Sequence, residues 1–185
     1  MRTSHIFRPL PWQRGLIACA LLIAPTAAIP AMAQSNVQGK ASVLLLEPMS
    51  LINTAPLDFG SIIPSPAGGD VTLDPSGSLT TSGGLVVLPA TAHPARFAGQ
   101  GSASRVIIRA TSNQIFLTGP GAQMRVDNFA IGDLSGLSQI GNGNNYRITS
   151  ANGIVGFSVG GRLRVNANQA GGDYTGSFTI TFNYQ

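Results

Sequence analysis

The sequence predicts an all-β protein whose strands pack as an antiparallel sandwich, and three observations support this prediction. Glycine and proline are frequent, with 23 and 12 of the 185 residues, as expected where many short strands are joined by turns. Charged residues make up only 10% of the chain, too few for a helical surface held by salt bridges. After residue 33, no segment of about eleven residues keeps an apolar helical repeat without meeting Gly or Pro, so no helix is expected.

The expected strands are short apolar runs bounded by turn residues. Their even spacing is typical of a sandwich or a barrel, and we favour a sandwich because no repeat of fixed period occurs. Pro48 separates the first two runs, which is tolerated only at a sheet edge or a bulge, so the N-terminal strand is expected at an edge. The expected strands are residues 41–46, 49–53, 57–63, 71–73, 85–88, 95–98, 105–110, 114–117, 124–128, 146–149, 154–159, 162–165 and 174–184.

Two glycine-containing pairs predict hairpins. The Asn-Gly pair at 152–153 lies between the expected strands 146–149 and 154–159, and Asn-Gly is a strong short hairpin signal. The Gly-Gly pair at 160–161 is expected to turn the chain from there into strand 162–165.

The first 33 residues have the features of a cleaved secretory signal peptide. Three arginines and no acid precede an apolar run at 15–28, and the small residues Ala31 and Ala33 form the pattern that signal peptidase cuts. The run is about 14 residues long, shorter than the ~20 that span a bilayer, so no transmembrane segment is expected after cleavage. We therefore expect export to the periplasm and then to the cell surface or the medium. Residues 34–185 would form one sandwich domain, with 34–40 as a flexible tail.

Cleavage would change the charge balance. The whole chain has a formal charge of +4, but residues 34–185 hold eight basic and seven acidic residues, a net charge of +1. We expect the arginines to lie singly on solvated faces, which predicts no nucleic-acid partner. These arginines are Arg96, Arg105, Arg109, Arg125, Arg147, Arg162 and Arg164.

The residue types that catalysis requires are scarce. Residues 34–185 contain one histidine, His93, and no cysteine, so the sequence predicts neither a nucleophile triad nor a zinc site. His93 precedes a proline and is expected in an extended, exposed loop. Glu47 is the only glutamate, and no pair of carboxylates has a spacing typical of glycosidases. We expect a non-enzymatic protein without a cofactor or a metal ion.

The C-terminal run has the clearest pattern in the chain. Residues 174–184 alternate between an apolar face and a face of Thr, Ser and Asn. At about 3.3 Å per residue, this period of two over eleven residues predicts a strand of about 36 Å with one face on the core. Because chain ends usually fray, the aromatic residue at the penultimate position, Tyr184, indicates that the far end of this strand is held.

Several motifs occur in order along the chain. They are residues 41–53, Leu57-Asp58-Phe59-Gly60-Ser61-Ile62-Ile63-Pro64, Val71-Thr72-Leu73-Asp74-Pro75 and the segment 167–176. Through them the chain resembles the secreted bacterial family called domain of unknown function 4402, over nearly all of residues 34–185. More distantly, Gly172, fourteenth from the C-terminus, and the alternating run that ends at Tyr184 resemble the end of chaperone-usher pilins. Asp58-Phe59-Gly60 and the C-terminal run are similar to spore coat U-like pilins.

The resemblance to pilins implies an immunoglobulin-like sandwich that lacks its final strand. It implies that a periplasmic chaperone, and after passage through an outer-membrane usher a neighbouring subunit, fills the gap beside the C-terminal strand. The positions that would face these partners are Gly172, Tyr174, Phe178, Ile180, Phe182 and Tyr184. A donor strand needs apolar residues at a spacing of two, which Val37, Gly39, Ala41, Val43 and Leu45 have. With 41–46 as the first strand of the domain, only the mostly polar tail 34–40 would be free, and it would be a poor donor.

Two functions of different classes are compatible with these patterns. The first is an exported structural or adhesive subunit of a pilus-like fibre or a cell-surface layer, assembled by β-strand complementation. The second is a self-complete secreted sandwich that binds a glycan or another surface ligand. They differ in whether the chain itself pairs both edges of its C-terminal strand.

Overall fold

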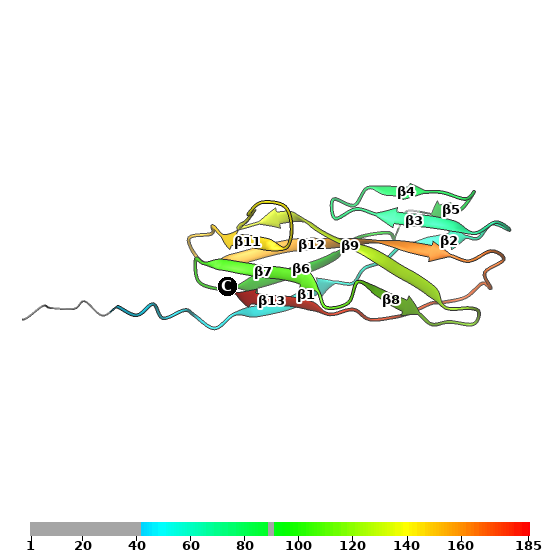
Figure 1. The fold of residues 1–185 in the computed structure, drawn as a ribbon. Coiled ribbons are helices and arrows are strands. Elements are labelled where there is room, and N and C mark those ends of the chain that lie inside the picture. The colour runs from blue at the N-terminus through cyan, green and yellow to red at the C-terminus, as the bar shows by residue number, and fades with distance from the viewer. Residues whose placement is uncertain (1–41, 89–90) are drawn as a thin grey trace, which may run out of the picture. The chain divides into compact units, whose positions relative to one another are not determined.

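The computed structural model describes residues 42–88 and 91–185, and their regular structure is entirely β (Figure 1). Residues Val43–Gln185 form one compact unit. The all-β prediction is confirmed. The predicted cleavage site at Ala31 and Ala33 and the donor positions Val37, Gly39 and Ala41 lie outside the described residues. The strands are β1 (Ser50–Ala55), β2 (Ser61–Ile63), β3 (Gly69–Leu73), β4 (Leu79–Thr81), β5 (Val86–Leu88), β6 (Ala95–Gln100), β7 (Arg105–Ala110), β8 (Gln114–Leu117), β9 (Met124–Ser135), β10 (Leu137–Gln139), β11 (Asn145–Ile148), β12 (Ile154–Val165) and β13 (Ile180–Tyr184).

The strands form two main sheets and a small two-stranded ribbon. The first sheet has the order β1-β6-β12-β3-β4, while β9 pairs with the other edge of β12 and β8 pairs with β9. The second sheet has the order β10-β11-β7-β13, and β2 pairs with β5. Every pairing is antiparallel. The predicted antiparallel sandwich is therefore confirmed, and β1 lies at a sheet edge as Pro48 predicts.

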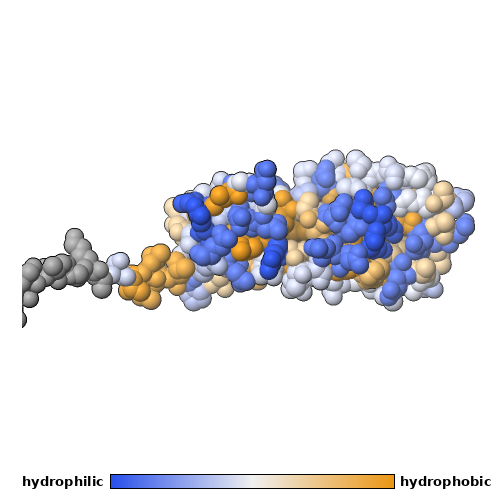
Figure 2. Space-filling view, in the orientation of Figure 1, coloured by the Kyte–Doolittle hydropathy of each residue, from blue (hydrophilic) through white to orange (hydrophobic). Residues whose placement is uncertain are grey.

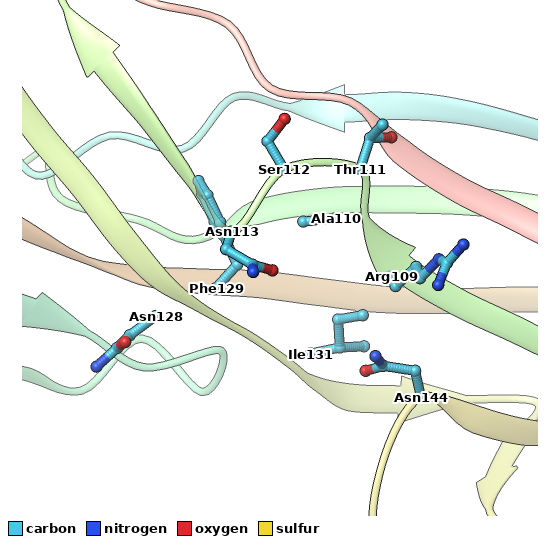
Figure 3. A pocket seen from close by; sticks show the side chains of 9 residues that line it. All are labelled: Arg109, Ala110, Thr111, Ser112, Asn113, Asn128, Phe129, Ile131 and Asn144. Carbon is cyan, nitrogen blue, oxygen red and sulfur yellow. The ribbon is translucent and has the colours of Figure 1, made fainter.

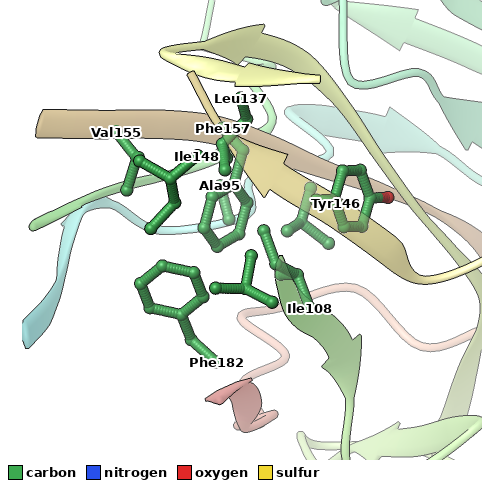
Figure 4. Close-up of a cluster of buried hydrophobic side chains, with 10 residues drawn as sticks. Ala95, Ile108, Leu137, Tyr146, Ile148, Val155, Phe157 and Phe182 are labelled. Atoms are coloured by element: carbon green, nitrogen blue, oxygen red, sulfur yellow. The ribbon is translucent and has the colours of Figure 1, made fainter. Parts of the chain in front are cut away.

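Buried side chains form two clusters along β12. Cluster 1 lies between the two sheets, where β12 faces β7, β11 and β13 (Figure 4). It consists of Ala95, Val106, Ile108, Leu137, Tyr146, Ile148, Val155, Phe157, Val159 and Phe182. Cluster 2 lies farther along β12 and receives no buried residue from the second sheet. It consists of Phe59, Val71, Leu73, Leu85, Met124, Val126, Leu163 and Val165.

Neither predicted hairpin forms. β12 runs without a break through Gly160 and Gly161. Gly160 is required there by a close backbone contact, because a Cβ on it would lie 2.1 Å from the carbonyl oxygen of Leu73. At Asn152 and Gly153 the chain does turn, with Gly153 at φ 72°, but β11 and β12 belong to different sheets. The Asn-Gly pair therefore makes a turn between sheets rather than a hairpin.

The N-terminal strand is shorter than predicted. Residues 42–46 of the expected strand 41–46 are in no strand, and β1 begins at Ser50. The physical reason is the partner strand: Ser50 pairs with Gln100, the last residue of β6, so β6 offers no ladder to earlier residues. The apolar residues 43–46 remain outside the sheet as a result.

The C-terminal strand is also shorter than the predicted 174–184. Only β13 forms a ladder, and Thr175 makes a single bridge to Thr118. The ladder begins where Ile180 pairs with Ala110, the last residue of β7, so earlier residues have no neighbouring strand there. The predicted alternation does hold, since Phe178, Ile180, Phe182 and Tyr184 all pack against cluster 1.

Several other bounds differ from the prediction. Only β2 and a bridge at Asp58 remain of the expected strand 57–63, whereas β9 extends well beyond 124–128. The sequence does not predict β4 or β10, which are three residues each. In so short a strand, neighbouring strands decide the conformation more than the local pattern does.

Candidate functional site

The outer edge of β13 is open. β13 ends the order β10-β11-β7-β13 and pairs only with β7, and no other strand of the described residues pairs with it. Such an edge presents unpaired N–H and C=O groups that another chain can extend.

The far end of β13 is anchored through Tyr184. Its hydroxyl accepts a hydrogen bond from the backbone N–H of Ser102 at 2.6 Å and donates one to the carbonyl oxygen of Glu47 at 2.9 Å. The N–H of Glu47 donates in turn to Oγ of Ser102 at 2.7 Å. The penultimate aromatic residue therefore holds the strand end, and it ties that end to the segment just before β1.

A groove of about 1030 Å³, lined by both polar and apolar residues, opens over cluster 2. Most of its lining comes from residues 56–64 and 169–178, and the rest includes side chains of β8, β9 and β12. The large apolar side chains that line it are Leu57, Phe59, Ile62, Phe97, Ile115, Leu117, Met124, Val126, Leu163, Val165, Tyr174 and Phe178. Five of these belong to cluster 2 itself, so the groove gives access to the core.

The segment that flanks the groove lacks backbone partners. Residues 176–178 make no backbone hydrogen bond to any described residue, although Thr175 and Thr179 on either side do. Phe178 is held by its ring, which stacks on Phe129 at a centroid distance of 5.1 Å. Gly176 and Ser177 are exposed, so the free backbone groups of this segment are accessible to an added strand.

Two of the predicted interface positions fasten the end of the groove. The Tyr174 hydroxyl accepts hydrogen bonds from the N–H of Gly121 at 2.9 Å and from Nε2 of Gln169 at 2.7 Å, and donates to the carbonyl oxygen of Ala170 at 2.9 Å. Gly172 has φ 134°, and a Cβ on it would lie 2.6 Å from Cγ of Pro120. Gln169 was not predicted, because nothing in its local sequence indicates that it is buried.

An apolar segment of the same chain is exposed. Side chains 43–46, here called the N-terminal apolar segment, include Val43 at 84%, Leu44 at 78% and Leu45 at 87% exposure. They form the hydrophobic projection next to the grey atoms in Figure 2. Of the predicted donor positions, Val43 and Leu45 are therefore accessible. Contiguous exposed apolar residues usually mark an interaction site.

A comparison with protein families identifies the family of this chain. A family model described as Domain of unknown function (DUF4402) matches residues 49–184. The chain belongs to this family. The sequence-based resemblance to it is confirmed, and the match covers β1 to β13 and the groove but begins after the N-terminal apolar segment. No curated protein and no solved structure matches the chain.

This DUF4402 domain also has a polar pocket of about 610 Å³ (Figure 3). It lies between β7 and β9 and is lined by Arg109, Ala110, Thr111, Ser112, Asn113, Asn128, Phe129, Ile131 and Asn144. Asn128 has φ 53°, a conformation that asparagine tolerates better than most residues. Three amides and a guanidinium suit a ligand that carries hydroxyl groups.

The arginines of the DUF4402 domain are less dispersed than predicted. Arg125, Arg162 and Arg164 meet at the carboxylate of Asp127. The sequence did contain a signal, because Arg125 and Asp127 are two apart in one strand, as are Arg162 and Arg164 in another. Only the pairing of β9 with β12 brings the two pairs together.

His93 has a structural role in the bridge to Asp58. His93 is half-buried rather than exposed, and its backbone N–H and C=O each bond to Asp58 at 2.9 Å.

Within residues 42–88 and 91–185, no three His, Cys, Asp or Glu side chains gather as a metal site would require. The described part of the chain also has no helix of the length and apolarity needed to cross a membrane.

Proposed function

We propose that this protein is an exported structural subunit that assembles into a fibre or surface layer by β-strand complementation. The groove over cluster 2 and the open edge of β13 are the acceptor, and the N-terminal apolar segment of another copy is the centre of the donor. The observation that carries the proposal is that one chain has both a groove that gives access to apolar core residues and an exposed apolar segment of strand-forming residues.

Burial of the donor supplies a large driving force. Full burial of a Val or Leu side chain is worth roughly 1.5–3 kcal/mol, so Val43 and Leu45, which share one face of an added strand, give roughly 3–6 kcal/mol before the entropic cost of ordering the segment. This gross gain reaches the lower end of the stability of a typical domain, roughly 5–15 kcal/mol. Backbone hydrogen bonds along residues 176–178 and β13 would add to it.

The geometry favours a donor from another copy. Glu47 is fixed beside Tyr184, whereas the groove begins near Phe178, six residues back along the C-terminal segment. Six extended residues span about 20 Å, but residues 43–46 span at most about 13 Å. The segment therefore cannot lie in its own groove while Glu47 stays bonded to Tyr184. A head-to-tail contact of this kind does not close, so it builds fibres.

The remaining partners follow from the acceptor. An unfilled groove and a free sheet edge would aggregate before assembly, so the subunit needs a protein that covers them in transit. The pilin-like C-terminal pattern supports a periplasmic chaperone for this task and an outer-membrane usher for the exchange. The leader-like residues 1–33 support export.

A synthetic peptide of residues 34–46 tests the proposal directly. Added to the purified protein, it should raise the thermal midpoint and suppress the filaments that electron microscopy detects. The control is the same peptide with Val43→Asp and Leu45→Asp, which should do neither. A protein that stays monomeric and gains no thermal stability from the first peptide contradicts the proposal.

The polar pocket supports a second candidate function, a self-complete module that binds a hydroxyl-rich ligand such as a glycan. Arg109 and Asn144 line this pocket and lie outside the groove over cluster 2. Arg109→Ala should then abolish glycan binding on an array and leave filament formation unchanged. Loss of neither property would leave the pocket without a role.

A further inference from the structure

Four charged side chains gather on the outer face of the first sheet. Arg162 is the register partner of Asp127, and Arg164 is the partner of Arg125. Register partners in an antiparallel pair project from the same face. The intervening Val126 and Leu163 point into cluster 2, so the four charged residues face outward. Figure 2 shows a strongly hydrophilic patch where β9 and β12 run together.

All three arginines direct the same atom, Nε, at the carboxylate of Asp127. Nε of Arg162 donates to Oδ1 of Asp127 at 2.8 Å, and Nε of Arg164 donates to Oδ2 at 2.9 Å. Nε of Arg125 lies 3.2 Å from Oδ2 but makes no hydrogen bond, although this atom is buried. The three guanidinium groups are thus held side by side by the aspartate between them.

The exposed part of this cluster is positively charged. The Asp127 side chain is only 12% exposed, while the arginine side chains are 26–40% exposed, so the negative charge is the more buried one. The hydrogen bond from Arg162 keeps the pKa of Asp127 below its usual value, so the carboxylate stays ionised at neutral pH. The other facing acid is Asp70, the register partner of Arg164 on β3. Three cations against two anions leave a net charge of +1.

Most of the donors in the cluster are unused. A guanidinium has five N–H donors, and each arginine directs only Nε at Asp127. The hydrogen bonds of the described residues include none from the Nη atoms of these three arginines. A guanidinium fork matches a carboxylate or sulfate group in a bidentate geometry, and the forks here are already positioned.

The neighbours of the cluster point to a sugar. Phe116 on β8 is the register partner of Arg125 and is 49% exposed, so its ring offers an apolar surface beside the guanidinium groups. Gln114 pairs with Asp127 on the same face, and Thr72 pairs with Arg162 from β3. An exposed ring, an amide and a hydroxyl beside fixed cations are the contacts that an acidic sugar residue uses.

We propose that this face of the first sheet, centred on Arg125, Arg162 and Arg164, binds the carboxylate or sulfate groups of an acidic polysaccharide. Nucleic acid is disfavoured because Arg105 and Arg147 lie together on the second sheet and do not extend the cluster into a stripe. The site does not depend on the fibre proposal, since its three arginines do not line the groove. In a fibre, repeated copies of it would bind one polysaccharide chain with avidity.

Binding of the purified protein to immobilised polysaccharides tests this site. The probes are polygalacturonate, which carries only carboxylates, heparin, which also carries sulfates, neutral dextran and duplex DNA. We expect binding to at least one acidic polysaccharide and none to dextran, and the two acidic probes show which group is preferred. Arg125→Gln and Arg164→Gln should each weaken binding roughly tenfold, the loss expected for one charge-assisted contact.

Arg147→Gln is the matched control, because it removes the same charge from an exposed position on β11. It should leave binding unchanged. Arg125→Gln keeps the test valid if Arg164→Gln fails to fold, because Nε of Arg125 makes no hydrogen bond. The proposal is overturned if neither acidic polysaccharide binds, if Arg147→Gln causes the same loss, or if DNA binds as tightly through the same arginines.

Discussion

The two core clusters show how differently one strand can be covered along its length. Around Phe157, β12 lies under the second sheet, and cluster 1 is closed on both sides by strands of this chain. Around Leu163, the same strand lies under a groove, and cluster 2 is covered by the segments 53–62 and 169–178 and by the β2-β5 ribbon. Strands of the second sheet therefore cover one end of β12, whereas a groove remains over the other end. In the proposed assembly, this groove is where a partner strand would bind.

The largest expected effect is in the closed half. Phe157→Ala should lower the free energy of unfolding by about 3–5 kcal/mol, because a buried ring that stacks on Phe97 at 5.2 Å is replaced by a cavity. Urea unfolding of the monomer measures this. Phe116→Ala is the control, since that ring is 49% exposed and its loss should cost less than about 0.5 kcal/mol. Equal costs at both sites would contradict the assignment of cluster 1 as the closed core.

The donor segment should show the opposite behaviour. Val43→Asp with Leu45→Asp should leave monomer stability within about 0.5 kcal/mol, because both side chains are exposed, yet abolish filaments. Leu44→Asp is the matched control, because its side chain would face away from the groove in an added strand. Electron microscopy and urea unfolding of the three proteins separate the two effects. Filaments that persist in the double variant would rule out this segment as the donor.

The sequence predicts local pattern well and partners poorly. The alternation of Phe178, Phe182 and Tyr184 can be predicted from the sequence because one face of a half-buried strand must be apolar. The run 43–46 has the same strand-forming composition, but it has no neighbour beyond Gln100 and stays outside the sheet. A ladder needs a second strand, and no local pattern states which strand that is.

Each candidate site likewise combines a local pattern that the sequence predicts with partners that it does not predict. The anchor at Tyr184 follows from its place at the chain end, whereas its partners Ser102 and Glu47 are distant in sequence. Each half of the arginine cluster is a spacing of two within one strand, but the cluster exists only because β9 pairs with β12. Gly160 is predicted in a turn because glycine permits turns. Only the fold shows that it is instead needed in β12, where a side chain would collide with the backbone of Leu73.

A smaller effect is expected at the hydrogen bonds that anchor the end of β13. Tyr184→Phe removes the hydroxyl that joins Ser102 to Glu47 and leaves a backbone N–H without its partner. The cost should be about 1–2 kcal/mol in the monomer. Faster amide exchange confined to residues around Ser102 and Glu47 would confirm the anchor. Tyr146→Phe is the control, because no hydrogen bond from the Tyr146 hydroxyl is found among the described residues. Amide exchange around Ser102 and Glu47 should be unchanged in this variant.

The smallest expected effect is a dependence of stability on pH that arises from the arginine cluster. The hydrogen bond from Arg162 lowers the pKa of Asp127 in the folded protein below the ordinary aspartate value of 3.8, so the unfolded chain binds a proton first as the pH falls. Stability from this group is therefore fully present above about pH 5 and is lost as the pH falls through the folded pKa, below 3.8. Asp127→Asn should flatten the stability curve in this acidic range and destabilise the protein at neutral pH, because three guanidinium groups would then face one another without a counter-charge. Arg162→Gln should also flatten the curve, since it removes the bond that lowers the pKa. A slope below pH 5 that is the same in all three proteins would show that Asp127 does not carry this dependence.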